Sequence, residues 1–134
     1  MNAEPGRALA NLPLPVMLIG FAEDVGLQIE QSLVRAGFEA RRARRPAEVA
    51  PGGVVLVSGD DDGFLATVGE IRRADARAWI AVVTQTIAVT KWLDGLTAGA
   101  NDFFSIPADA WYLRLMLSHI EDSSRRRAVN DGSE

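Results

Sequence analysis

The sequence contains no cysteine and a single histidine, His119, among its 134 residues. The absence of cysteine excludes disulfide bonds and thiolate metal sites, and it fits a reducing compartment. With one histidine, the chain offers no set of side chains for a zinc site or a catalytic triad. We therefore expect a domain that its hydrophobic core alone stabilises, without a metal or a cofactor.

Long apolar runs are also absent. No segment approaches the roughly 18 apolar residues that span a bilayer, and residues 1–15 lack the basic and apolar regions of a secretory signal. We therefore expect a cytoplasmic protein that makes no membrane contact.

The net charge of −4 argues against a dedicated nucleic-acid binder, so we expect nucleic acid to be bound only through a separate domain, if at all. Arginines at positions 41, 42, 44 and 45 nevertheless form a local basic run, and 125–127 form another. The first run lies on an expected edge strand, where charge discourages the addition of further strands. An acidic partner or nucleic acid is the alternative reading of this run.

The chain is ordinary in length and composition. Its 48% apolar and 24% charged residues are typical of a globular protein and exclude general disorder. A chain of 134 residues fits one domain. We expect a flexible segment at 1–12, a domain at 13–122, and a polar tail or linker at 123–134, as though another domain followed.

Short apolar runs indicate buried strands at residues 16–20, 54–57, 79–84 and 102–106. A weaker strand near 38–44 alternates with polar residues and suits a sheet edge.

Helical patterns lie between these strands. The first runs from Val25 to Ala36, with Asp24 placed to cap it and Gly37 to end it. Others cover 64–74, 89–98 and 108–125, whereas 46–51 has room for one helical turn at most. This alternation predicts an α/β domain with a five-stranded parallel sheet, doubly wound and flavodoxin-like, whose second helix is shortened or missing.

The sequence resembles a known family at two places. Residues 98–107, Ala-Gly-Ala-Asn-Asp-Phe-Phe-Ser-Ile-Pro, resemble the junction Ala-Gly-Ala-x-(Asp/Gly)-(Tyr/Phe)-x-x-Lys-Pro of response-regulator receiver domains. Val82-Val83-Thr84 is similar to the end of their fourth strand, and the spacing from Thr84 to Gly99 matches without a gap. The resemblance covers about residues 15–122, and it implies a site at the carboxyl ends of the strands, where open parallel sheets bind ligands.

The resemblance also implies which residues would form that site. Working receivers hold Mg²⁺ with two acids after strand one, phosphorylate an Asp at the end of strand three, and bind the phosphoryl oxygens with a Thr or Ser and a Lys. The acid pair falls on Gly20 and Phe21, and the Lys falls on Ile106. The acceptor falls on Ser58 or, with a one-residue slip, on Gly59.

Only Thr84 keeps a residue type that the family uses, so we expect a degenerate site that does not transfer phosphate. We also expect Pro107 to follow a cis peptide bond, as this step often does in receivers. Phe21 could fill the vacated metal position, which would leave a closed pocket.

Two alternatives concern the same edge of the sheet. Asp60, with Glu23 or Asp24, could replace the missing acids, but the insertion this needs after strand one would break the register of the first helix. Alternatively, the altered pocket near Phe21, Ser58 and Thr84 could bind a small molecule. A hydrolase or transferase is disfavoured because no nucleophile, base and oxyanion donor converge, so we do not expect an enzyme.

The last two helices carry more apolar side chains than one buried stripe needs. Exposed together, they would form a patch of the kind that marks interaction sites. The residues assigned to this face are Trp92, Phe103, Trp111, Tyr112, Leu115, Met116 and His119. We therefore expect a pseudo-receiver that binds a protein partner or dimerises through helix four, strand five and helix five, and regulates an attached or partner output domain. The alternative is that these side chains pack inside one monomer.

Overall fold

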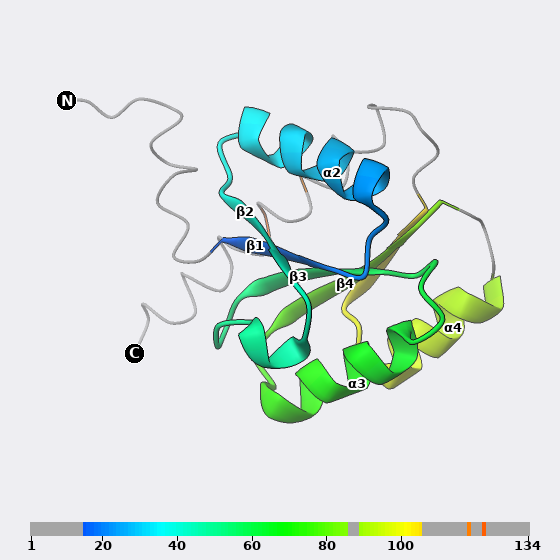
Figure 1. Cartoon of the computed structure of the whole chain (residues 1–134). Coiled ribbons are helices and arrows are strands. Elements are labelled where there is room, and N and C mark those ends of the chain that lie inside the picture. The colour runs from blue at the N-terminus through cyan, green and yellow to red at the C-terminus, as the bar shows by residue number, and fades with distance from the viewer. Residues whose placement is uncertain (1–14, 86–88, 106–117, 119–121, 123–134) are drawn as a thin grey trace.

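A computed structural model describes residues 15–85, 89–105, 118 and 122 of the chain (Figure 1). Strands and helices alternate along it, as the sequence predicts. The elements are β1 (Val16–Ile19), α2 (Glu23–Arg35), β2 (Ala40–Ala43), the 3₁₀ turn η1 (Pro46–Glu48), β3 (Val54–Ser58), α3 (Phe64–Ala74), β4 (Trp79–Thr84), α4 (Val89–Ala98) and β5 (Asp102–Ser105). The three-residue turn η1 stands where a second crossover helix would lie, which confirms that this helix is shortened.

The five strands form one sheet in the order β2-β1-β3-β4-β5, and every neighbouring pair is parallel. The weak strand β2 is an edge strand, as predicted. From β1 the chain first moves outward to β2 and then returns past β1 to β3, so the direction of winding reverses between β1 and β3. In open parallel sheets, ligands bind beside the carboxyl ends of the strands at such a reversal.

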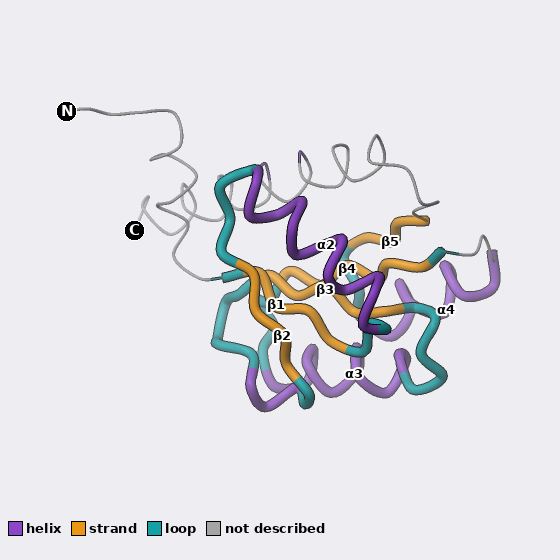
Figure 2. The backbone as a smooth tube through the Cα atoms, turned by 45° about the horizontal axis from the view of Figure 1, so that its top comes forward, coloured by secondary structure: helices purple, strands orange, loops and turns teal. Residues whose placement is uncertain are grey.

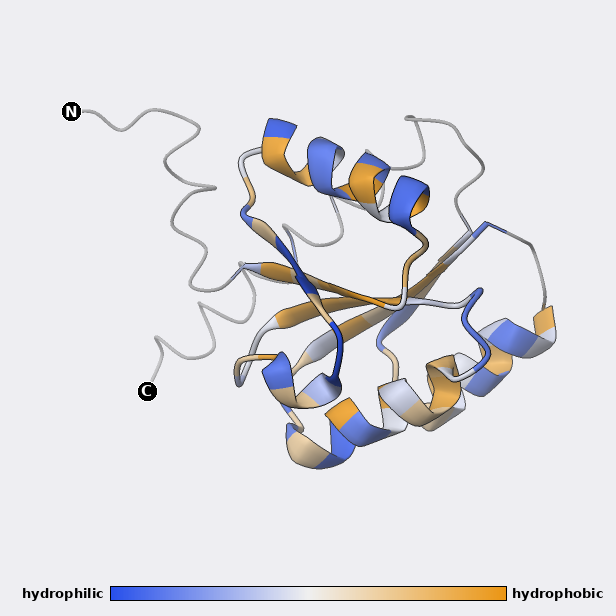
Figure 3. Ribbon diagram, viewed as in Figure 1, coloured by the Kyte–Doolittle hydropathy of each residue, from blue (hydrophilic) through white to orange (hydrophobic). Residues whose placement is uncertain are grey.

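Helices cover both faces of the sheet, with α2 on one face and α3 and α4 on the other (Figures 1 and 2). Side chains alternate between the faces because successive residues of a strand point in opposite directions. Leu18 and Leu56 join Ile29 and Leu33 in the core under α2, whereas the core over α3 and α4 contains Val55, Ile80, Val68 and Ile71 among others. Colouring by hydropathy shows apolar central strands and a hydrophilic β2 (Figure 3).

The first helix begins earlier than the sequence predicts. Ala22 occupies the N-cap position and makes no side-chain capping bond, so the expectation that Asp24 caps this helix is wrong. Asp24 lies in the first turn instead, where its Oδ1 accepts a hydrogen bond from the Val25 N–H at 2.9 Å. Gly37 follows the helix with φ of 96°, a left-handed conformation that glycine adopts readily, and so fits its predicted role at the helix end.

Several expectations fall outside the described residues: the flexible segment 1–12, the tail 123–134, the Ile106-Pro107 peptide bond and most of the fifth helix. Ser118 and Asp122, the two described residues of that helix, are both helical. Among the described residues, no helix is long and apolar enough to cross a membrane.

Candidate functional site

Three loops meet at the carboxyl edge of the sheet, after β1, β3 and β4. The pairing of Ile19 with Val57, and of Ser58 with Val83, aligns the ends of these strands. The structure therefore brings together the positions that the sequence analysis assigned to the degenerate site, except those that follow β5. Ile106 and Pro107 lie outside the described residues.

Gly20 follows β1 with φ of 85°, a left-handed conformation that a side chain would strain. A Cβ built at Gly20 would lie 3.5 Å from the Cβ of Asp61 and 3.6 Å from the Cβ of Ser58. The side chain of Phe21 is partly buried and packs against the core under α2. Asp61 and Ser58 therefore lie beside the first position of the expected acid pair, and the backbone there has a conformation that favours glycine.

The end of β3 is tightly packed. Ser58 is buried, and its Oγ accepts a hydrogen bond from the Asp60 N–H at 3.3 Å. At Gly59, an added Cβ would come within 2.8 Å of Val82 Cγ1 and 3.2 Å of Thr84 Cβ. A side chain at position 59 would therefore have to displace Val82 or Thr84, which argues against the one-residue slip.

The Asp60 side chain is hydrogen-bonded at the carboxyl edge of the sheet. The Thr84 hydroxyl donates a hydrogen bond to Asp60 Oδ1, and the Gln85 N–H donates one to Oδ2 at 2.9 Å. Lys91, from α4, donates from Nζ to the Gly59 carbonyl at 3.0 Å. The loop after β3 is thus bonded both to the end of β4 and to the first turns of α4.

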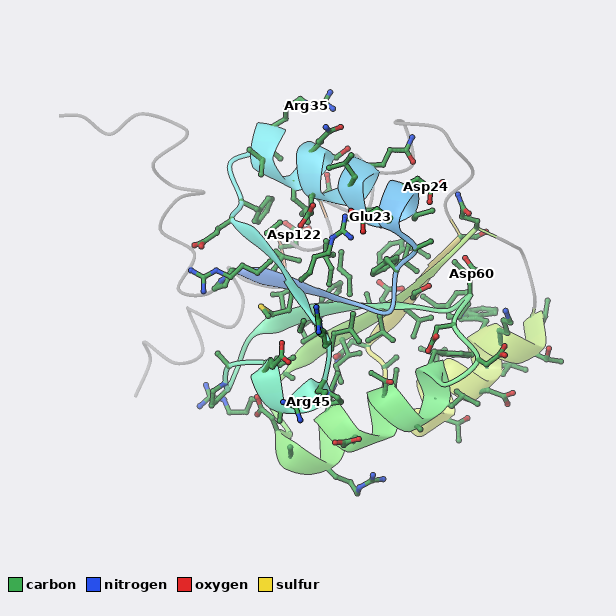
Figure 4. The ribbon with its side chains drawn as sticks, viewed as in Figure 1. Glu23, Asp24, Arg35, Arg45, Asp60 and Asp122 are labelled. Carbon is green, nitrogen blue, oxygen red and sulfur yellow. The ribbon has the colours of Figure 1, made fainter. Side chains whose placement is uncertain are left out.

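Glu23 and Asp24, the other acids considered as replacements, lie at the start of α2 (Figure 4). The Glu23 carboxylate lies 3.3 Å from Arg42 Nη1 on β2, and Asp24 binds its neighbour's N–H as described above. Among the described residues, no group of three or more His, Cys, Asp or Glu side chains could hold a metal ion.

An apolar stripe runs along the exposed side of α4. It consists of Val89, Trp92, Leu93 and Leu96, which are 61%, 47%, 55% and 37% exposed. Their spacing of three and four residues places them on one side of the helix. On the sheet-facing side, Gly95 is buried, and a Cβ built there would lie 3.5 Å from a ring carbon of Phe103.

Trp92 and Phe103 are the two residues of the expected interaction face that the structure describes. Trp92 is exposed, whereas Phe103 is partly buried against the core over α3 and α4. The other residues of that face lie outside the described residues: Trp111, Tyr112, Leu115, Met116 and His119.

Sequence reasoning missed three features: the bonds of Asp60, the reach of Lys91, and the contribution of Val89, Leu93 and Leu96 to the stripe. The helical spacing on α4 could have revealed the stripe. The bonds of Asp60 have no such signal, because they join residues 24 and 25 positions apart along the chain.

No protein-family model matches the chain, and no curated protein matches it by sequence. Solved structures match its fold. A response regulator from Thermotoga maritima has a TM-score of 0.68 at 17% identity, covering 83% of this chain and 98% of that one. An atypical orphan response regulator, described as having a phosphorylation-independent regulatory mechanism, has a TM-score of 0.66 at 20% identity, covering 84% of this chain and 96% of its own.

The beryllofluoride-activated NtrC4 receiver domain, which is described as a dimer, has a TM-score of 0.65 at 17% identity, covering 82% of this chain and 98% of that one. Because these sequence identities are low, the matches show similarity of the fold. They agree with the strand order β2-β1-β3-β4-β5 and with the helices on both faces of the sheet. The chain therefore folds as a receiver-like domain, with the flavodoxin-like architecture of response-regulator receivers.

Proposed function

We propose that this chain is a signalling module that works without phosphorylation and acts by binding a protein partner or a second copy of itself. Independence from phosphorylation is supported by the residues at the carboxyl edge of the sheet. Gly20, Phe21 and Ser58 stand at the positions of the Mg²⁺ ligands and the phosphate acceptor. Glycine and phenylalanine side chains have no oxygen to offer a cation that requires oxygen ligands. Serine at the acceptor position cannot form an acyl phosphate.

Asp60 is the acid that could still accept a phosphoryl group. Both of its carboxylate oxygens accept hydrogen bonds, from the Thr84 hydroxyl and the Gln85 N–H. In a working receiver such donors would bind the phosphoryl oxygens and leave the acceptor carboxylate free to attack. This arrangement supports a structural role for Asp60. The atypical orphan regulator described as phosphorylation-independent is a precedent within the same fold.

The first prediction is that the chain forms no phosphoryl adduct. Incubation with acetyl phosphate or phosphoramidate and Mg²⁺ should leave its intact mass unchanged, because the edge lacks the acid pair that would hold the metal. Beryllofluoride, which mimics the phosphoryl group, should not shift its melting temperature. A receiver with an intact acid pair and acceptor, treated in parallel, shows that the reagents work. An adduct that is lost in Asp60→Asn would contradict the proposal and identify Asp60 as the acceptor.

The stripe on α4 supports the second half of the proposal. Four apolar side chains in a row on one exposed helix face form the kind of patch that marks protein interaction sites. Burial of these side chains against a partner would remove apolar surface from water. The free energy of that transfer is favourable by roughly 25 cal/mol per Å² of apolar area. Trp92 is the expected anchor, because tryptophan is enriched among the residues that dominate binding energy. The description of one structural neighbour as a receiver dimer is a precedent for self-association.

The second prediction tests this surface. Leu93→Asp and Trp92→Ala should each weaken self-association or partner binding by about fivefold or more, since central apolar contacts are worth roughly 1–3 kcal/mol. Both side chains are exposed, so both variants should retain the fold. Sedimentation over a concentration series measures the effect for self-association. The control is Val34→Asp, which places the same charge at an exposed apolar position on α2.

If the wild type associates and both α4 variants sediment like it, the stripe is not the interface. If Val34→Asp weakens association as much as Leu93→Asp, the loss reflects added charge and not this surface.

The proposal also covers the bounds of the domain, its place in the cell and its output, which follow from the sequence pattern. The receiver-like domain extends over residues 13–122, with a flexible segment before it and a polar tail or linker after it. The module lies in the cytoplasm and is not an enzyme. It regulates an output domain, either attached to the same chain or on its partner.

A further inference from the structure

The outer edge of β2 is open to the addition of a strand. No strand of the described residues pairs with it, because β2 stands first in the order β2-β1-β3-β4-β5. On the inner side, the Val16 N–H donates to the Glu39 carbonyl at 2.8 Å, and Val16 pairs with Ala40. Backbone groups of successive residues point to opposite edges of a strand, so those of Ala40 and Arg42 point away from β1. These two residues therefore offer their backbone N–H and C=O groups to a strand added from outside.

A surface groove lies between α2 and this strand. Its volume is about 570 Å³, and it is lined by Leu27, Glu30, Gln31, Val34, Arg35 and Ala40. Ala40 belongs to β2, and the other five residues belong to α2. Leu27 and Val34 are exposed and lie two turns apart on one side of the helix. We call this groove, together with the edge of β2, the α2–β2 groove. It combines an apolar helix face with a strand edge that can form backbone hydrogen bonds.

The chain around the groove is basic, although the protein as a whole is acidic. Residues 35–45 contain five arginines against one glutamate, which gives +4, whereas the whole chain carries −4. Arg42 is paired with two glutamates of α2, both at 3.3 Å. Arg41 pairs with Glu39 at 2.8 Å, and its side chain is 64% exposed. Exposed pairs of this kind contribute little to stability, so a carboxylate of a ligand can compete for Arg41. The charge therefore favours an acidic ligand.

We propose that the α2–β2 groove binds an extended segment of a partner protein in which apolar and acidic residues alternate, and that this segment adds to the sheet as a strand beside β2. The groove is separate from the apolar stripe on α4, so this inference goes beyond the proposed function. Alternate residues of an added strand point to opposite faces of the sheet. Those on the α2 face meet Leu27 and Val34, which favours apolar side chains. Those on the other face lie on the same side of the sheet as Arg41, which favours carboxylates.

Two other occupants match the groove less well. A second copy would pair β2 with β2 across a two-fold axis and bring two arginine runs together, and like charges on neighbouring strands are destabilising. Single-stranded nucleic acid would gain from the arginines, but none of the six lining residues is an aromatic on which a base could stack. An acidic, extended peptide uses the strand edge, the apolar helix face and the arginines together.

The test is the binding of a synthetic peptide to the full chain, measured by fluorescence anisotropy. The probe is a fluorescein-labelled peptide that repeats Leu-Glu-Val-Glu twice. Val34→Asp should weaken its binding by about fivefold or more, because the new charge removes apolar contact and repels the acids of the peptide. Arg41→Glu should also weaken it, and a peptide with Lys in place of Glu should bind Arg41→Glu more tightly than the wild type. Both positions are exposed, so both variants should fold. Leu93→Asp, which changes α4 alone, is the matched control and should bind the probe like the wild type.

Two further measurements separate strand addition from attraction between charges. A peptide of the same composition, with its four apolar residues grouped before its four glutamates, should bind about fivefold or more weakly, because it cannot place apolar and acidic side chains on opposite faces. With the alternating peptide bound, the N–H groups of Ala40 and Arg42 should exchange with solvent about tenfold or more slowly, because hydrogen-bonded amides are protected.

The inference is wrong if the alternating peptide does not bind, if the grouped peptide binds equally well, or if exchange at Ala40 and Arg42 is unchanged. Tighter binding of a labelled oligothymidine than of the peptide would assign the groove to nucleic acid instead. Self-association that an excess of the peptide disperses would assign it to a second copy. Val34→Asp is the disruptive variant here and the control for the stripe on α4, so failure at one surface is distinguishable from failure at the other.

Discussion

Gly99→Ala is expected to lower the free energy of unfolding by roughly 3 kcal/mol, the combined cost of backbone strain and a forced steric contact. Gly99 has φ of 125°, a conformation that L residues rarely adopt. An added Cβ would lie 2.8 Å from Cγ and 3.0 Å from Cβ of Arg72. These atoms are the base of the arginine side chain, close to the α3 backbone, and cannot swing away. Urea or guanidinium denaturation measures the change.

A second glycine provides the matched control. Gly69 lies in α3, and a Cβ built there would meet only the far end of the Arg73 side chain, at 3.4 Å. Gly69→Ala should therefore stabilise the domain by about 0.5–1 kcal/mol, through better helix propensity. Equal effects of the two substitutions would show that the junction at Gly99 tolerates a side chain and that our account of it is wrong.

The other large effect is expected at Arg72. Its guanidinium bonds to the Gly99 carbonyl at 3.0 Å, to the carbonyls of Asp75 and Ala76 at 3.2 and 2.8 Å, and to Asn101 Oδ1 at 2.8 Å. Arg72→Ala should therefore destabilise the domain by roughly 2–3 kcal/mol, a discounted sum because the side chain is partly exposed. Denaturation with Arg73→Ala as the control measures this, since the neighbouring Arg73 is exposed and should contribute within about 0.5 kcal/mol.

Asn101 extends the same network. Its Oδ1 also accepts a hydrogen bond from the Ile80 N–H at 2.8 Å, and its own N–H donates to the Ile80 carbonyl at 2.7 Å. The double variant Arg72→Ala/Asn101→Ala should lose less than the sum of the single losses, because the two side chains share a bond. Additive losses, or an Arg72→Ala loss no larger than that of Arg73→Ala, would refute the network.

The contacts of Gly99 and Asn101 give a physical reason for the residues Ala98-Gly99-Ala100-Asn101-Asp102, the first half of the segment 98–107 that resembles the receiver junction. Gly99 supplies the backbone conformation and the room that Arg72 needs. Asn101 supplies the acceptor that joins Arg72 to β4. The same junction sets β5 against α4, so it supports the helix that carries the apolar stripe.

The order of elements could be predicted from the sequence because each strand of a doubly covered sheet is apolar on both faces. The runs at 54–57 and 79–84 correspond closely to β3 and β4, which are buried along their whole length. The start of α2 was less predictable. Asp24 is a good capping residue by type, but the helix begins before it, and Ala22 takes the N-cap position without a side-chain bond.

The candidate site, like the fold, could be predicted from the sequence only in part. The sequence by itself sufficed to assign Gly20, Phe21 and either Ser58 or Gly59 to the positions where a receiver needs acids, because that assignment needs residue identity and register alone. Only the tertiary structure decided that Asp60 bonds to Thr84 and Gln85 and that Lys91 bonds to Gly59. Those outcomes depend on loop paths and on packing between residues far apart in the chain, and local sequence patterns carry no record of either.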